Sequence, residues 1–177
     1  MSRRDEVLKA ALELLDEVGL DALTTRRLAE RLGVQPGALY RHFASKRALL
    51  DAMVEHVAAQ GVVSTRKPVG DWADQLTVAA GNLRAAMLSR RDGARLMTTF
   101  AEPGPAALAG WQWFLDLLRS AGASDSLALL AVDTIMSYVN GFTIEEQARK
   151  TDVPRRTRDD QFRAGLALVI AGIRTGL

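Results

Sequence analysis

Apolar residues recur three or four positions apart along most of this chain, and no stretch of convincing length alternates between apolar and polar residues as a half-buried strand would. The first such segment covers residues 3–18, and Gly19 follows it where a helix can end. The same spacing predicts further helices at 71–90, 92–100, 105–121, 124–149 and 159–176. The hydrophobic pattern therefore predicts an all-α protein.

Two short helices joined by a tight turn are predicted in residues 23–46, LTTRRLAERLGVQPGALYRHFASK. Thr24 or Thr25 can cap the first helix with its hydroxyl, and Gly33 can end it because glycine tolerates a left-handed backbone. Pro36 suits the first position of the second helix, where no N–H is needed. This pattern is typical of a helix-turn-helix unit, in which the second helix enters the major groove of DNA.

Positive charge is concentrated in the same region. Residues 22–47 contain six Arg or Lys against the single acid Glu30, a net charge of +5, whereas the whole chain carries only +2. The rest of the chain is therefore net acidic, at −3. A local basic patch of this kind is what binding to phosphates requires. The alternative is a pair of core helices in some other bundle, with solvated arginines.

The string TTRRLAERLGVQPGALYRHFASKRALL closely resembles the DNA-binding domain of the tetracycline-repressor (TetR) family of bacterial transcriptional regulators. The resemblance covers the first quarter of the chain without a gap and includes Leu39-Tyr40-x-His42-Phe43 followed by Ser45-Lys46. We expect a three-helix helix-turn-helix domain at 1–44 and a helical ligand-binding and dimerisation domain at 45–177. The DNA-binding residues that the resemblance implies are Thr25, Arg26, Gly37, Ala38, Tyr40, Arg41, His42 and Lys46.

The resemblance also implies two kinds of DNA contact. Base edges or their neighbours would be met by Arg26, Gly37, Ala38 and Tyr40, and phosphates by Thr25, His42 and Lys46. Because Gly37 and Ala38 are small, sequence readout there would come from close approach and contact with thymine methyl groups. A longer helix capped by Ser45 would connect the two domains.

Large apolar and polarizable side chains are frequent in the second half of the chain, with few polar groups among them. Such an inventory suits an apolar ligand cavity with a few orienting contacts. For any one of these side chains, packing in a core is the alternative. The candidate ligand-binding residues are Leu83, Met87, Met97, Phe100, Trp111, Phe114, Met136 and Asn140.

The predicted helices at 124–149 and 159–176 are too apolar for both to face water along their whole length. Small residues on the second helix allow another helix to approach closely, so we expect a four-helix seam between two copies of the chain. The alternative is that the two helices bury each other within one protomer. A homodimer would present two recognition helices to a palindromic operator in double-stranded DNA.

A weaker resemblance to the tetracycline repressors themselves extends into this half, through the strings SRRDGARLM and NGFTIEEQ. In those proteins a histidine and a glutamate take part in binding a drug–magnesium chelate. The glutamate position matches Glu145, but the histidine position falls on Met97, and two other site positions fall on Val62 and Ala79. A thioether is a poor ligand for magnesium. We therefore expect a small apolar effector that needs no divalent cation, and we expect no cofactor.

Neither catalysis nor membrane insertion is expected. The chain has no cysteine, only two histidines and no glycine loop of the kind that cradles phosphates, and the adjacent Glu145 and Glu146 do not face each other. Its first residues lack the apolar core of a signal peptide, and the longest uncharged apolar run, 164–173, is well short of the ~20 residues of a membrane helix. The basic cluster formed by Arg155, Arg156 and Arg158 is expected in a solvated loop.

These observations predict a cytoplasmic bacterial transcriptional regulator, a repressor that binds its operator as a homodimer and is released by a small apolar effector. The alternative is a DNA-binding regulator or architectural protein with no small-molecule ligand. Whether a small molecule weakens DNA binding distinguishes the two.

Overall fold

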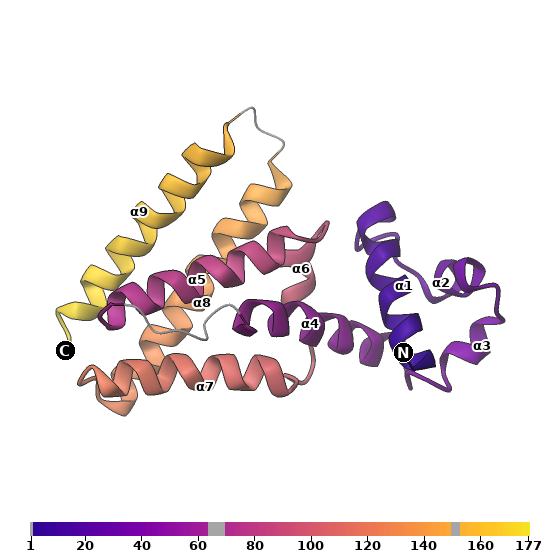
Figure 1. Ribbon diagram of the computed structural model, residues 1–177, viewed down its shortest axis with the longest axis horizontal. Helices are drawn as coiled ribbons and strands as arrows, with labels where there is room; N and C mark the ends of the chain where they lie inside the picture. The colour runs from indigo at the N-terminus through magenta and orange to yellow at the C-terminus, as the bar shows by residue number, and fades with distance from the viewer. Residues whose placement is uncertain (1, 64–69, 150–152) are drawn as a thin grey trace.

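The structure is a computed structural model that describes residues 2–63, 70–149 and 153–177. Every regular element in these ranges is an α-helix, which confirms the all-α prediction. The molecule is elongated, with a small helical unit at one end and a larger one at the other (Figure 1). Helix α4 (Lys46–Val63) runs from the first unit into the second, where it contacts α5, α6 and α7.

The N-terminal unit is formed by α1 (Arg3–Val18), α2 (Thr25–Leu32) and α3 (Pro36–Leu39). Ser2 begins α1 with a capping box, in which the side chains of Ser2 and Asp5 each accept a hydrogen bond from the other's backbone N–H. The three helices bury a shared apolar core that includes Leu15, Leu28 and Leu39. The start of the chain is therefore held in place from Ser2 onward.

The turn between α2 and α3 follows the sequence prediction. The hydroxyl of Thr24 accepts a hydrogen bond from a backbone N–H in the first turn of α2, and Gly33 ends that helix with φ 64° and ψ 31°. Pro36 is the first residue of α3. The α3 helix is shorter than expected, since it ends at Leu39, but the amide of Phe43 still donates to the Leu39 carbonyl over 3.0 Å.

The larger unit consists of α5 (Trp72–Leu88), α6 (Gly93–Met97), α7 (Pro105–Ser120), α8 (Asp125–Ala148) and α9 (Arg155–Arg174). The expected helix at 92–100 is wrong in length, because only α6 is helical there. The hydroxyls of Thr98 and Thr99 bond to carbonyls three residues back, and these side-chain bonds compete with continuation of the helix.

The basic cluster near residue 155 was assigned to the wrong kind of structure. Arg155, Arg156 and Arg158 lie in the first turn of α9, not in a loop, and the amide of Arg158 donates to the carbonyl of Pro154 over 3.2 Å. Pro154 has an extended backbone, with ψ 143°, and the helix begins at the next residue. Residues 150–152, between the helices predicted at 124–149 and 159–176, lie outside the described residues.

Candidate DNA-binding surface and ligand cavity

The residues predicted to meet base edges lie on α2, α3 and the turn that follows. Gly37 is exposed, Ala38 is half-buried, and the side chain of Tyr40 is 52% exposed. Leu39 and Phe43 point inward, and each is 5% exposed. The small and aromatic residues of this segment are therefore presented at the surface, while its large aliphatic and Phe side chains hold it to the core.

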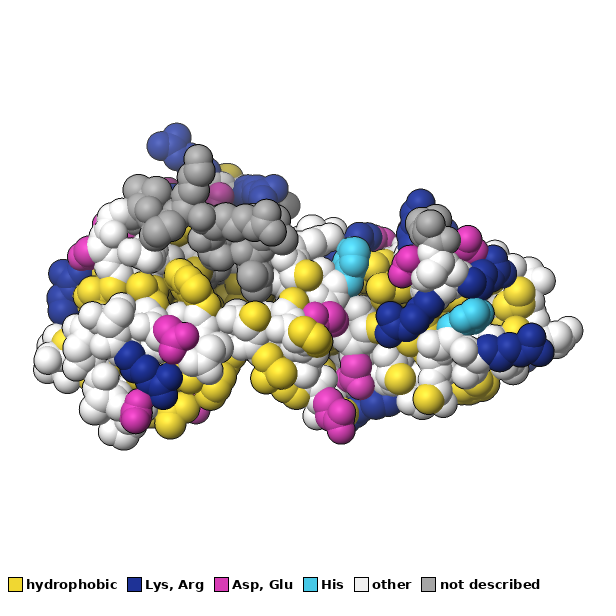
Figure 2. Space-filling model, turned by 60° about the horizontal axis from the view of Figure 1, so that its bottom comes forward, with side chains coloured by type: hydrophobic (Ala, Val, Ile, Leu, Met, Phe, Trp, Pro, Cys, Tyr) yellow, Lys and Arg dark blue, Asp and Glu magenta, His cyan; other side chains and the backbone are white. Residues whose placement is uncertain are grey.

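The other predicted DNA-binding residues, which include the predicted phosphate contacts Thr25, His42 and Lys46, surround the same segment. Arg26 is exposed and forms an ion pair with Glu30 one turn along α2, at 3.0 Å, while Thr25 is half-buried beside it. Arg41 and Lys46 are exposed, and His42 is half-buried. Figure 2 shows Lys and Arg side chains gathered over the end of the molecule that α1, α2 and α3 form. The structure thus brings the predicted DNA-binding residues together at one end.

Two arginines of this region, Arg4 and Arg31, contact other side chains of the protein. Arg31 forms ion pairs with Glu17 at 2.7 Å and with Glu13 at 3.1 Å, which join α2 to α1. Hydrogen bonds to Glu17 and then Glu13 raise the pKa of the Arg31 guanidinium. The guanidinium of Arg4 lies 4.7 Å from the centre of the Phe43 ring, a cation–π contact between the start of α1 and the turn that follows α3. The sequence-based charge count treated Arg31 as free, because its partners lie on another helix.

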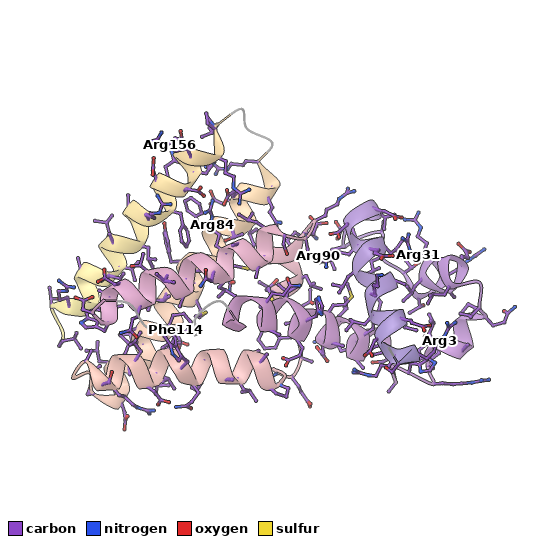
Figure 3. The ribbon with its side chains drawn as sticks, viewed as in Figure 1. Arg3, Arg31, Arg84, Arg90, Phe114 and Arg156 are labelled. Carbon is purple, nitrogen blue, oxygen red and sulfur yellow. The ribbon has the colours of Figure 1, made fainter. Side chains whose placement is uncertain are left out.

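A cavity of about 600 Å³ lies in the larger unit and is lined by residues of α4, α5, α6, α7 and α8. Of the predicted ligand-binding residues, it is lined by Leu83, Met97, Phe100, Trp111, Phe114, Met136 and Asn140. Met87 is not among the lining residues and is fully buried in the core. Figure 3 shows Phe114 projecting from α7 into the space between α7 and α5.

The cavity wall is mostly apolar and aromatic. Trp113 and Phe114 pack edge to face with ring centres 5.1 Å apart, and both belong to the wall. Small residues that sequence reasoning did not select, including Ala58, Gly61 and Ala106, make room for the cavity. No local sequence signal distinguishes these small residues from core alanines and glycines.

The positions that match a metal-binding pair are separated in this chain. Met97 and Ala79 line the cavity, but Glu145 does not, and it forms an ion pair at 3.1 Å with Arg149, the residue that follows α8. The side chain of Val62 lies outside the described residues. Within the described ranges, no group of three or more His, Cys, Asp or Glu side chains is arranged to hold a metal ion.

A set of polar contacts joins the N-terminal unit to the corner between α5 and α6, and we call it the α1–α6 clamp (Figure 3, beside Arg90). Two ion pairs belong to it, Arg90–Asp16 at 2.7 Å and Arg95–Asp21 at 2.8 Å. Two hydrogen bonds also belong to it: the Arg91 guanidinium donates to the backbone carbonyl of Glu17, and the backbone N–H of Leu20 donates to the Asp92 carboxylate. The hydrogen bond from Arg95 lowers the pKa of Asp21. Sequence reasoning missed the clamp, because its partners lie far apart in the chain.

A second ionic network is buried within the larger unit. Arg84 of α5 forms an ion pair with Glu146 of α8 at 2.7 Å and another with Asp159 of α9 at 2.7 Å (Figure 3). Its guanidinium also lies 4.9 Å from the centre of the Phe162 ring. The hydrogen bond from Arg84 lowers the pKa of Asp159. The network fixes α8 and α9 to the helix that forms one wall of the cavity.

Comparison with known proteins covers both units. Residues 7–53 match the family described as bacterial regulatory proteins, tetR family, and residues 64–158 match the tetracyclin repressor-like C-terminal domain. The tetracycline repressor protein class A from transposon 1721 of Escherichia coli is 44% identical over 151 residues, which cover 85% of this chain and 69% of that protein. The class C repressor of Escherichia coli is 41% identical over 158 residues, covering 89% and 72%.

Solved structures share the whole fold. A possible TetR family transcriptional regulator from Streptomyces coelicolor A3(2) superposes with a TM-score of 0.90 at 35% identity, over 97% of this chain and 98% of that one. A variant of TetR from Acinetobacter baumannii AYE in complex with minocycline gives 0.87 at 39% identity, over 99% and 98%. BioQ with its double-stranded DNA operator gives 0.76 at 34% identity, over 98% of each chain.

Proposed function

Because this chain belongs to the tetR family of bacterial regulatory proteins, we propose that it represses transcription from a palindromic operator. Members of this family are DNA-binding transcriptional regulators that act as homodimers. The protein would leave the operator when a small, mainly apolar molecule fills its cavity. The similar structures with a bound drug and with a bound operator support both halves of this proposal. The main support for this proposal is the position of α6, which belongs both to the cavity wall and to the α1–α6 clamp. This helix contributes Met97 to the cavity wall, and its Arg95 belongs to the clamp.

Coupling between the two sites would run through this short helix. A ligand lowers operator affinity only to the extent that it binds the DNA-incompetent arrangement more tightly than the competent one. A ligand that displaces Met97 acts on a helix of which Arg95 is also part, and Arg95 reaches Asp21 in the DNA-binding unit. Helix α4 offers a second connection, because Ala58 and Gly61 line the cavity while Lys46 begins the same helix at the DNA-binding end.

The homodimer would form through α8 and α9. Leu130 of α8 is 64% exposed and Leu168 of α9 is 76% exposed, although both helices also bury an apolar face within the protomer. By length and composition α8 is long and apolar enough to cross a membrane, and a third of its most apolar stretch is buried. We assign the exposed leucines to a dimer seam instead, because α8 and α9 together supply the four-helix arrangement that a two-fold axis produces.

Three further assignments complete the proposal. The DNA-binding domain would end at Ala44 and the regulatory domain begin at Ser45, whose hydroxyl accepts a hydrogen bond from the Ala48 amide at the start of α4. The protein would work in the bacterial cytoplasm, where the operators of such regulators lie. It would have no catalytic activity of its own; its relatives are regulators and not enzymes.

The test begins with DNA selected by the full-length protein from a random pool. We expect a palindrome with half-site centres about one helical turn, ~34–36 Å, apart, and binding that weakens steeply as salt rises. Hydrophobic compounds that quench the tryptophan fluorescence of the protein should then release this DNA in a saturable manner. An asymmetric site bound by one protomer would overturn the dimeric reading. Compounds that bind without releasing DNA would favour a regulator with no small-molecule control.

A further inference from the structure

One acidic side chain, that of Asp133, lies in the otherwise uncharged wall of the cavity. Asp133, Met136 and Asn140 follow one another at helical spacing along α8, so that one face of this helix supplies all three to the lining. Within residues 2–63, 70–149 and 153–177, the carboxylate of Asp133 has neither an ion pair nor a hydrogen bond. The wall therefore contains a negative charge without a protein partner.

A second acid, Glu55, lies beside cavity-lining residues, but its carboxylate is already hydrogen-bonded within the protein. Glu55 of α4 accepts hydrogen bonds from the backbone amides of Ala106 at 2.6 Å and Ala107 at 3.4 Å, and so it satisfies the first turn of α7. Arg and Lys are absent from the described lining residues. Asp133 is thus the charged group that a molecule in the cavity would meet.

Aromatic rings form much of the remaining wall, and they add to the preference for positive charge. Phe100, Trp111, Trp113 and Phe114 line the cavity, and the face of an aromatic ring attracts cations through its quadrupole. A carboxylate and several aromatic faces in one cavity make its potential negative. An anionic ligand would meet repulsion here with no cation to offset it.

We propose that the effector is an amphipathic monocation, such as a substituted ammonium, with its charge at Asp133 and its apolar body against the aromatic wall. This inference rests on the proposed function, in which the cavity holds the effector. Asp133 is exposed in the single protomer, and the exposed Leu130 lies one helical turn from it, so the dimer seam would be what removes water from the carboxylate. Burial of an unpaired charge is unfavourable, and a bound cation removes that penalty.

Two compounds of the same shape test the charge preference directly. Benzyltrimethylammonium is a cation, and neopentylbenzene replaces its nitrogen with carbon. Binding is followed by the fluorescence of Trp111 and Trp113, in the full-length wild-type protein and in the variants Asp133→Asn and Glu145→Gln. Glu145 is a matched control, since it is an exposed acid of α8 outside the cavity lining.

We expect the wild type and Glu145→Gln to bind the cation roughly tenfold more tightly than the neutral compound. Asp133→Asn should lose most of this preference and bind the neutral compound as before. Equal affinities in the wild type would overturn the inference, and so would a preference that survives in Asp133→Asn. Sedimentation of each variant adds a check: dissociation of Asp133→Asn into protomers, with its preference unchanged, would place the carboxylate in the dimer seam and also overturn it.

Release of the selected operator separates this inference from the function on which it rests. If the neutral compound binds and releases DNA while the cation does not, regulation through the cavity stands and the charge assignment fails. If the cation binds with the expected preference but releases no DNA, the charge assignment stands and the proposed induction fails.

Discussion

The carboxylate of Asp92 accepts a hydrogen bond, 2.8 Å long, from the backbone N–H of Leu20. Asp92 directly precedes α6 as its N-cap residue, but its side chain makes no capping hydrogen bond. It reaches the DNA-binding unit instead, from a backbone with φ 54°. The residue before α6 therefore ties the cavity wall to the segment that follows α1.

Replacing Asp92 tests whether the clamp transmits the ligand signal. Asp92→Gly removes the carboxylate, and glycine adopts a positive φ without strain. We expect unchanged ligand affinity by calorimetry but a several-fold smaller ligand-induced loss of operator affinity, because a coupling of about 1 kcal/mol would disappear. Asp92→Asn keeps an acceptor oxygen and should behave as wild type. Full release of DNA by the Gly variant would show that the signal takes another route.

The buried network around Arg84 should dominate the stability of the larger unit. Arg84→Met leaves Glu146 and Asp159 without their partner and should cost about 3 kcal/mol of unfolding free energy, measured in urea at fixed protomer concentration. Arg163→Met removes an exposed pair with Asp160 and should cost less than about 0.5 kcal/mol. Equal losses in the two variants would contradict this assignment.

The same network predicts a dependence on pH. The hydrogen bond from Arg84 lowers the folded-state pKa of Asp159 below the ordinary value of an aspartate, 3.8, so the stabilisation is fully present well above that value. It should be lost as the pH falls through the folded-state pKa, because protonation then removes the negative charge. Urea midpoints measured from pH 6 downward should fall in the wild type. Asp159→Asn should remove this part of the fall.

Two substitutions should separate phosphate contact from base readout. Lys46→Ala should weaken operator and random DNA alike and flatten the salt dependence, because a phosphate contact carries no sequence information. Ala38→Leu places bulk on α3 and should abolish or alter operator choice while much of the affinity for random DNA remains. Binding measured by fluorescence anisotropy at several salt concentrations gives both quantities. Identical effects of the two changes on both DNAs would mean that the recognition helix is misplaced.

Induction should not need a divalent cation. Met97 occupies the cavity wall where the resemblance places a histidine, and Glu145 pairs with Arg149 outside the wall. Any compound that releases the operator should therefore act equally with and without a chelator. Tetracycline with magnesium is the sharpest probe. If it releases the operator and a chelator abolishes the effect, Glu145 belongs to a metal site and this prediction is wrong.

The proposed seam makes a prediction about assembly. Leu168→Lys puts a charge on the most exposed leucine of α9 and should convert the dimer into protomers, because an unpaired charge cannot be buried between helices without a large penalty. Val78→Lys changes an exposed residue of α5 and should leave the dimer intact. Analytical ultracentrifugation reads both. A Leu168→Lys variant that remains dimeric would place the seam elsewhere.

Local features of this chain could be predicted from the sequence, because short-range physical rules govern them. Thr24, Gly33 and Pro36 act at the ends of α2 and α3 through their own backbone and hydroxyl chemistry, which neighbouring residues suffice to specify. The predicted cavity residues were also largely brought together, because large apolar side chains on several amphipathic helices must converge on one interior.

The tertiary structure alone decided which groups meet across the chain. Nothing near Asp92 in the sequence points to Leu20, and nothing near Arg84 points to Asp159, since these partners lie in segments far apart in the chain. Met87 and Met97 have the same side chain on neighbouring helices, yet one is buried in the core and the other lines the cavity. Helical spacing determines which face of a helix is apolar, but the packing of the other helices determines whether that face meets protein, a ligand or a second protomer.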